Sequence, residues 1–191
     1  VNNRAGNVSV GRNHEIDIKS MELASEGLKS WKTDIREIHI PRQETKTVLD
    51  WLHNGKGDKP GERVSVLVGN AGTGKSVVMH DILEELIKGG IPVLGIKMDQ
   101  INFHSTTEFN NEVGLNEGIS VFEAYKQLND KHGLSVLLID QIDALSMSLS
   151  VDRKAIDVAN KLIHQVSTLP NVRIVVSCRR FDLDYDYDLQ E

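Results

Sequence analysis

Two hydrophobic periods alternate along the chain and predict a succession of strands and helices. Short continuous apolar runs predict buried strands at residues 64–68, 91–98, 134–139 and 172–176. Apolar positions three or four residues apart predict helices at residues 77–88, 119–132 and 152–169. This alternation favours a three-layer α/β/α fold, in which helices cover both faces of a mainly parallel central sheet.

Residues 1–60 predict a leader and a short helical segment packed on the core, which occupies residues 61–191. A short strand and two helices are expected in this first part, at residues 16–18, 20–31 and 42–53. Pro41 precedes the second helix, where its fixed φ suits a helix start. The Gly-rich residues 54–61 then predict a turn-rich linker into the first strand of the core.

Two polar stretches interrupt the pattern. Residues 99–118 predict an irregular excursion over the surface. Residues 181–188 alternate acidic side chains, but Tyr187 stands where a calcium loop needs Gly, so a solvated edge is the preferred interpretation.

The strongest chemical motif lies between the first strand of the core and the helix after it. Residues 69–76 match G-x-x-x-x-G-K-[ST], the phosphate-binding P-loop, in the strand–turn–helix context that the motif requires. Glycines let the backbone N–H groups turn inward, and the helix adds the positive end of its dipole. The residues expected to bind the nucleotide are Gly69, Asn70, Ala71, Gly72, Thr73, Gly74, Lys75, Ser76 and Val77.

Two residues of the chain are expected to hold Mg²⁺ beside the phosphates. Lys75 brings an ammonium to the β- and γ-phosphates, and the Ser76 hydroxyl is the first expected metal ligand. Asp140 follows the apolar run 134–139, as in a Walker B motif, and is the second. An Asp after a strand is also a common turn residue, and pairing with an upstream P-loop favours the metal-binding interpretation.

The residue after Asp140 departs from a common ATPase pattern. Many P-loop ATPases place Glu there to polarise the attacking water, whereas Gln141 cannot accept a proton. We therefore predict that Asp143 orients or activates the water, with a helix cap as its alternative role. Arg179, at the end of the last strand, is predicted to contact the γ-phosphate, unless it pairs with the acidic residues just beyond it.

Composition limits the classes of function and the compartment. The net charge of −6 gives no support to a general nucleic-acid-binding surface, although a local basic patch stays open. A single cysteine, Cys178, fits a reducing compartment and a buried structural thiol. Without an apolar run long enough for a membrane span or a signal peptide, we expect a cytoplasmic protein with no membrane partner.

At the P-loop, at Asp140 and Asp143, and at Arg179, the chain resembles the STAND class of signal-transduction P-loop ATPases, particularly its bacterial NACHT-like branch. The resemblance covers about residues 38–182 and implies a P-loop NTPase fold with ATP or ADP and Mg²⁺ as cofactors. It also implies that Arg42, before the second helix, lies near the base. In that family ADP holds the ATPase closed, and ATP together with a ligand opens and oligomerises it.

The family continues with a fifth core strand and with C-terminal regulatory and sensor regions that this sequence lacks. Because Val1 is also not an initiator Met, we expect a C-terminally incomplete core and a longer parent chain. If the family's strand order holds, the strand that precedes the P-loop lies at an uncovered sheet edge.

The preferred hypothesis is a Mg-dependent ATPase that binds ATP, hydrolyses it slowly and acts as a nucleotide switch in a larger signal-transduction or defence protein, with ATP-dependent homo-oligomers. The first alternative is a nucleic-acid-associated AAA-type ATPase, and DNA-stimulated hydrolysis would favour it. A P-loop kinase is a further alternative, but residues 99–118 lack the basic cluster that a second phosphate group would need. A nucleotide-bound scaffold would differ from the preferred hypothesis only in turnover.

Overall fold

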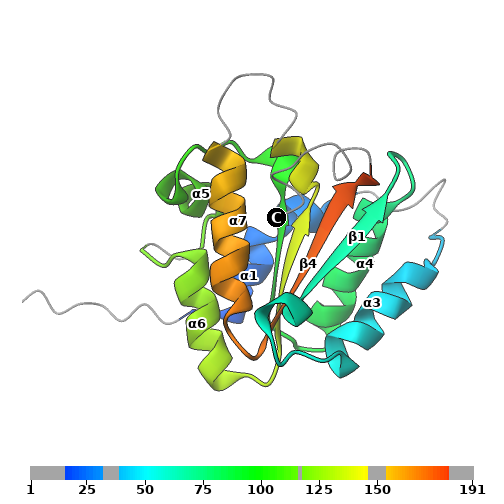
Figure 1. The fold of residues 1–191 in the computed structure, drawn as a ribbon, viewed down its shortest axis with the longest axis horizontal. Helices are drawn as coiled ribbons and strands as arrows, with labels where there is room; N and C mark the ends of the chain where they lie inside the picture. Colours follow the sequence, from blue (N-terminus) through cyan, green and yellow to red (C-terminus); the bar gives the residue numbers. More distant parts are fainter. Residues whose placement is uncertain (1–15, 32–38, 116–117, 146–153, 181–191) are drawn as a thin grey trace, which may run out of the picture.

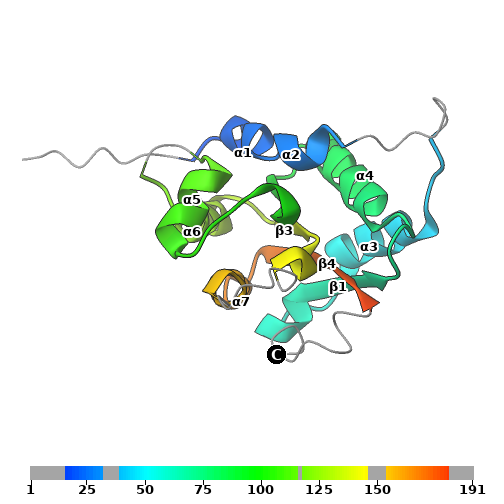
Figure 2. The ribbon, with the colours of Figure 1, turned by 90° about the horizontal axis from the view of Figure 1, so that it is seen from above.

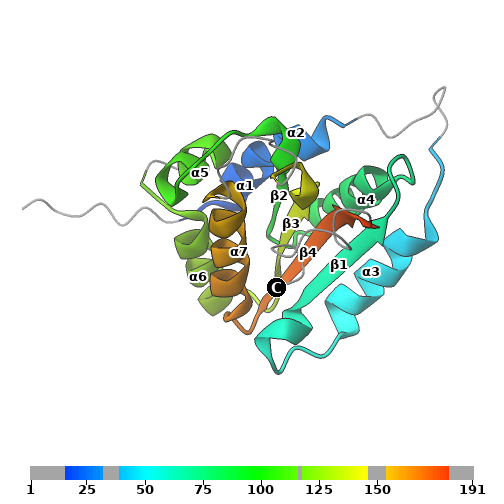
Figure 3. The ribbon, with the colours of Figure 1, turned by 45° about the horizontal axis from the view of Figure 1, so that its top comes forward.

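A computed structural model describes residues 16–31, 39–115, 118–145 and 154–180. Its centre is a four-stranded sheet in the order β1-β4-β3-β2, with every neighbouring pair parallel (Figure 3). The strands are β1 (Val64–Gly69), β2 (Val93–Lys97), β3 (Ser135–Asp140) and β4 (Val172–Arg179). The α/β fold class and the mainly parallel sheet expected from the sequence are therefore confirmed.

Helices cover both faces of this sheet, as the two perpendicular views show (Figures 1 and 2). On one face lie α3 (Gln43–Asn54) and α4 (Lys75–Lys88). On the other lie α5 (Thr106–Val113), α6 (Val121–Lys131) and α7 (Lys154–Ser167). Successive residues of β3 point to opposite faces, so Val136 and Leu138 pack with α4, while Leu137 and Ile139 pack with α6 and α7.

Two short helices, α1 (Ile18–Ala24) and α2 (Glu26–Lys29), pack beside β2 at one side of the sheet (Figure 3). The sequence pattern predicted one helix there and a strand near Ile18, and both expectations are wrong in detail. Asp17 caps the start of α1, and the helical pattern is interrupted at Ser25, between α1 and α2. The buried Ser25 hydroxyl donates to the carbonyl of Met21 and accepts a hydrogen bond from the backbone N–H of Gly95 in β2. Ser25 thus pairs an N–H group of the strand's outer edge.

The stretch 99–118 contains regular structure, contrary to the expectation of an irregular excursion. The 3₁₀-helix η2 (Met98–Gln100) follows β2, and α5 begins after Ser105, whose hydroxyl caps it. Phe103 and Phe109 are both buried, with their ring centroids 4.9 Å apart. Two buried phenylalanines therefore anchor a segment whose polar composition concealed its core contacts.

The 3₁₀-helix η1 (Pro60–Arg63) connects the linker to β1. The buried guanidinium of Arg63 donates to the carbonyls of Gly57 and Ser167, and so ties the linker to the end of α7. A further 3₁₀-helix, η3 (Ile142–Leu145), follows β3. Within the described ranges β1 has a single strand neighbour, β4, as expected for the strand before the P-loop. The acidic stretch 181–188 lies outside the described residues.

Candidate nucleotide-binding site

The P-loop connects the carboxyl end of β1 to the first turn of α4 (Figure 1). Gly72 and Gly74 have φ values of 75° and 91°, a region that side chains with a Cβ disfavour. Gly74 is the N-cap of α4 and makes no side-chain capping bond; the first helical hydrogen bond runs from the N–H of Val78 to the Gly74 carbonyl. The N–H groups of the three preceding residues, Lys75 to Val77, are therefore donors for an anion.

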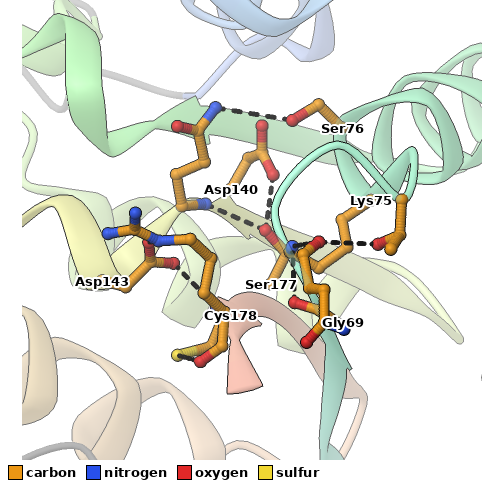
Figure 4. A network of polar contacts seen from close by, with 11 residues as sticks. Gly69, Lys75, Ser76, Asp140, Asp143, Ser177 and Cys178 are labelled. Atoms are coloured by element: carbon orange, nitrogen blue, oxygen red, sulfur yellow. Dashed lines mark hydrogen bonds and ion pairs between the residues drawn. The ribbon is translucent and has the colours of Figure 1, made fainter. Parts of the chain in front are cut away.

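The side chain of Lys75 lies back across the P-loop (Figure 4). Its ammonium donates to the carbonyl oxygens of Gly69 and Asn70, at 2.9 and 3.0 Å. Thr73 closes the same turn, because its hydroxyl donates to the Asn70 carbonyl at 2.9 Å. These contacts hold the ammonium over the concave side of the loop, where the phosphates of a nucleotide would take the place of the carbonyls.

Asp140 ends β3 and is fully buried beside β4 (Figure 4). The hydroxyl of Ser177 in β4 donates to Oδ1 of Asp140 and accepts the backbone N–H of Gln141, at 2.9 Å. Oδ2 of Asp140 is buried and has no hydrogen-bond partner in the described structure. One carboxylate oxygen is thus fixed by the neighbouring strand, and the other remains available as a ligand.

Gln141 is the only non-Gly residue with positive φ in the described part of the chain, at 59°. Such a backbone costs of order 1 kcal/mol and persists where its surroundings impose it. The contact with Ser177 fixes its N–H, and its side-chain amide lies 3.4 Å from the Ser76 hydroxyl (Figure 4). Gln141 therefore spans the space between the two expected metal ligands.

Asp143 and Arg179 form one unit at the carboxyl ends of the strands. Oδ2 of Asp143 accepts the Arg179 Nε at 2.5 Å, and Oδ1 accepts the Arg179 backbone N–H at 3.1 Å. The Asp143 side chain is 3% exposed, whereas that of Arg179 is 29% exposed. The carboxylate thus fixes both the backbone and the side chain of the arginine.

These groups surround one pocket of about 480 Å³. Its lining includes the predicted residues Ala71, Gly72, Gly74, Lys75, Ser76, Val77, Asp143 and Arg179. Asp140 lies behind Gln141 rather than in the wall. Trp31 and Asp99 also line the pocket, and neither was singled out from the sequence. Sequence spacing alone gave no signal for them, because they come from the segments that flank β2.

Residues 65–187 match the model of the ATPase family associated with various cellular activities (AAA). The chain belongs to the AAA family. The match covers more than half of the sequence and includes the P-loop, Asp140 and Arg179. No curated protein shows significant sequence similarity to the chain.

Several solved structures are similar to this AAA domain at low sequence identity. The Walker-type ATPase paby2304 of Pyrococcus abyssi is 18% identical, with a TM-score of 0.52 over 83% of this chain and 52% of that protein. The ORC1 protein of Aeropyrum pernix, solved in complex with DNA, is 18% identical with a TM-score of 0.45, covering 79% of this chain and 43% of its own. PCH-2 of C. elegans is 16% identical with a TM-score of 0.39, and the match covers 90% of this chain and 37% of PCH-2. The AAA domain spans about half the length of the Pyrococcus protein, and a smaller share of the other two proteins.

Arg42, the expected base-site residue, lies against the P-loop of the AAA domain. It is the N-cap of α3, and a Cβ built on Gly74 would stand 3.0 Å from its Nη2. Its Nε is buried and makes no hydrogen bond to any described residue. Arg42 therefore contacts the loop at the start of α4, and it does not line the pocket.

The donor set fits Mg²⁺ bound together with a nucleotide. The Ser76 hydroxyl lines the pocket, and Oδ2 of Asp140 is a buried carboxylate oxygen without a hydrogen-bond partner in the described structure. Both are hard oxygen donors, and Mg²⁺ in such sites takes few protein ligands. The described residues contain no group of three or more His, Cys, Asp or Glu that would hold a metal unaided. When bound, Mg²⁺ would neutralise charge on the phosphates.

None of the described helices has the length and apolar character needed to cross a membrane. The Cys178 thiol is buried in the core beside Ser177, as expected from the sequence.

Proposed function

We propose that this AAA domain is a Mg-dependent nucleotide switch that binds ATP or ADP and hydrolyses ATP slowly. The observation that carries the proposal is the convergence of Lys75, Ser76 and Gln141 on one pocket, with Asp140 directly behind them. A proton acceptor after Asp140 would favour rapid attack by water, and an amide in that position favours a long-lived ATP state.

The pair of Asp143 and Arg179 supports a sensor role for the arginine. Arg179 lines the pocket and is held there by Asp143, and a γ-phosphate would compete with that carboxylate for the guanidinium. ADP lacks the competing group, so the pair would distinguish the two nucleotides. The hypothesis that Asp143 itself activates the water remains a prediction, although both of its oxygens already accept hydrogen bonds from Arg179.

We further propose that the domain belongs to a larger signal-transduction ATPase of the STAND class, with NACHT-like relatives and a role in signalling or defence. In such a protein ATP binding would promote assembly into homo-oligomers, and C-terminal regulatory and sensor regions would determine which ligand triggers that assembly. The coverage of about half of the Pyrococcus ATPase supports a longer parent protein. The single cysteine supports the cytoplasm as its compartment.

Calorimetric titration with Mg-ATP and Mg-ADP tests the nucleotide site. We expect both to bind, and Lys75→Ala to abolish binding of Mg-ATP because it removes the ammonium from the phosphate cradle. Lys126→Ala, on the exposed face of α6, is the matched control and should bind as the wild type does. Equal binding by wild type and Lys75→Ala would refute the proposed site.

Phosphate release then tests turnover. We expect slow hydrolysis of Mg-ATP that is insensitive to added DNA. Strong stimulation by DNA would instead support the nucleic-acid-associated alternative, and transfer of phosphate to a small acceptor would support a kinase. If ATP binds but is never hydrolysed, the domain is a nucleotide-bound scaffold, and the proposed ATPase activity is refuted.

A further inference from the structure

The pocket offers the attacking water no proton acceptor at the position where many ATPases use Glu. The amide of Gln141 can accept a hydrogen bond from the water but cannot take up its proton, so another group must accept that proton if hydrolysis occurs. Two carboxylates line the pocket within the described residues, Asp99 and Asp143. They differ in how much of each is available to a ligand.

Asp143 is the less available of the two. Its side chain is 3% exposed, and one oxygen accepts the Arg179 backbone N–H while the other accepts the Arg179 Nε. Moving Asp143 onto a water would release the arginine that lines the pocket. The geometry therefore assigns Asp143 to positioning Arg179.

Asp99 is fixed in place and yet open to the pocket. It lies in η2, two residues after Lys97, and Lys97 pairs with Asp140 in the register of β2 and β3. The carboxylate is 36% exposed, and its oxygens lie 2.7 and 2.8 Å from the Lys97 ammonium. Asp99 thus stands next to the strand end that carries the expected metal ligand.

Lys97 itself has little freedom. Its side chain is fully buried, and its ammonium lies 4.3 Å from the ring centroid of Trp31, at the end of the α1–α2 segment. A buried ammonium that is paired with a carboxylate and packed on an aromatic face keeps a defined geometry, because moving away from the carboxylate would leave a buried charge unpaired. Lys97 and Trp31 together therefore hold Asp99 at the pocket wall.

We propose that Asp99 is the catalytic residue that orients the attacking water, a role that rests on the proposed ATPase function. The water oxygen forms a bond to the γ-phosphorus as the bond from that phosphorus to the β–γ bridging oxygen breaks. ADP leaves with that electron pair, and the proton lost by the water passes to Asp99 and then to solvent. Asp99 thus supplies the acceptor that residue 141 lacks.

The decisive experiment is single-turnover phosphate release by Asp99→Asn in the full chain. We expect the rate constant to fall by about 100-fold, while the Kd for Mg-ADP stays within about twofold, because the P-loop is unchanged. Asp130→Asn, an exposed change at the end of α6, is the matched control and should leave the rate unchanged. Circular dichroism and Mg-ADP binding show whether each variant is folded.

Asp99→Glu keeps a carboxylate within reach of Lys97 and should recover at least part of the rate that Asp99→Asn loses. If Asp99→Asn prevents folding, the double variant Lys97→Met/Asp99→Asn, which removes both charges of the pair together, becomes the test, and a wild-type rate in it would overturn the proposal. A wild-type rate in folded Asp99→Asn would overturn the role of Asp99 and leave the ATPase intact. If the wild-type chain itself hydrolyses no ATP, the proposed ATPase function is refuted.

Discussion

The Ser177 hydroxyl lies between Asp140 and Gln141, donating to the carboxylate of the first and accepting the backbone N–H of the second. It therefore joins β4 to the end of β3 at the position where the metal ligand is expected. Ser177→Ala would leave a buried acceptor and a buried donor unpaired, at a cost of about 1–3 kcal/mol. We expect the affinity for Mg-ATP to fall about tenfold, equivalent to about 1.4 kcal/mol, because Asp140 loses its fixed orientation.

Calorimetry in the presence and absence of Mg²⁺ checks this prediction, since binding of metal-free ATP should change little. Ser135→Ala is the matched control, because Ser135 is also buried in the sheet but lies at the amino end of β3, away from the pocket. An unchanged affinity for Mg-ATP in folded Ser177→Ala would show that Ser177 has no role in orienting Asp140.

Gln141→Glu places a carboxylate where the wild type has an amide. We expect single-turnover hydrolysis to accelerate by about tenfold or more, because a second acceptor then faces the attacking water. Gln141→Gly, which accommodates the φ of 59° without a side chain, serves as control and should not accelerate the reaction. No gain in Gln141→Glu would mean that the water attacks away from residue 141.

Ser25 stabilises the attachment of the α1–α2 segment to β2. Ser25→Ala removes a buried hydroxyl that satisfies the Gly95 N–H at 2.8 Å, and should lower the free energy of unfolding by about 1–3 kcal/mol. Urea denaturation measures the difference, and Ser30→Ala, exposed at the end of α2, should differ from wild type by less than about 0.5 kcal/mol. Equal losses in both variants would contradict the proposed contact.

Tyr125 makes the stability of the domain depend on alkaline pH. Burial raises its pKa well above the ordinary value, and its hydroxyl donates to the Val136 carbonyl. The unfolded chain therefore loses the phenol proton at lower pH than the folded chain. The stabilisation is complete below about pH 10 and is lost as the pH rises beyond it.

Tyr125→Phe should cost about 1 kcal/mol at neutral pH, through loss of the hydrogen bond, and should flatten the decline above about pH 10. Denaturant midpoints measured from pH 8 to pH 12 give both quantities. A variant that declines as steeply as the wild type would show that another group controls alkaline unfolding.

The sequence predicted the parts of the site that depend on local spacing. The P-loop follows from glycines at fixed positions between a strand and a helix, and Asp140 and Arg179 follow from the ends of apolar runs. Ser177 directly follows the predicted strand 172–176, but its contacts depend on β4 lying next to β3. Asp99 and Trp31 reach the pocket only because β2 and the α1–α2 segment pack beside it.

The errors in the fold have the same physical origin. One amphipathic pattern over residues 20–31 concealed the break at Ser25, because the break is stabilised by a backbone group of β2 distant in sequence. The polar composition of residues 99–118 outweighed the few aromatic residues that anchor α5. Local periodicity reports the average character of a segment, whereas tertiary contacts at single residues decide where an element begins or ends.

The position of β1 in the sheet gives the two halves of the nucleotide site unequal stiffness. Asp140 and Arg179 end strands β3 and β4, each of which is paired on both sides, whereas the P-loop grows out of β1, which is paired on one side within the described ranges. Backbone amides of an edge strand open more readily than those at the centre of a sheet. Asp140 and Arg179 therefore lie on the more rigid side of the site, and the P-loop lies on the more compliant side. Any partner that pairs with the open edge of β1 would therefore stiffen the strand from which the P-loop extends, and so would change how firmly the loop holds a phosphate.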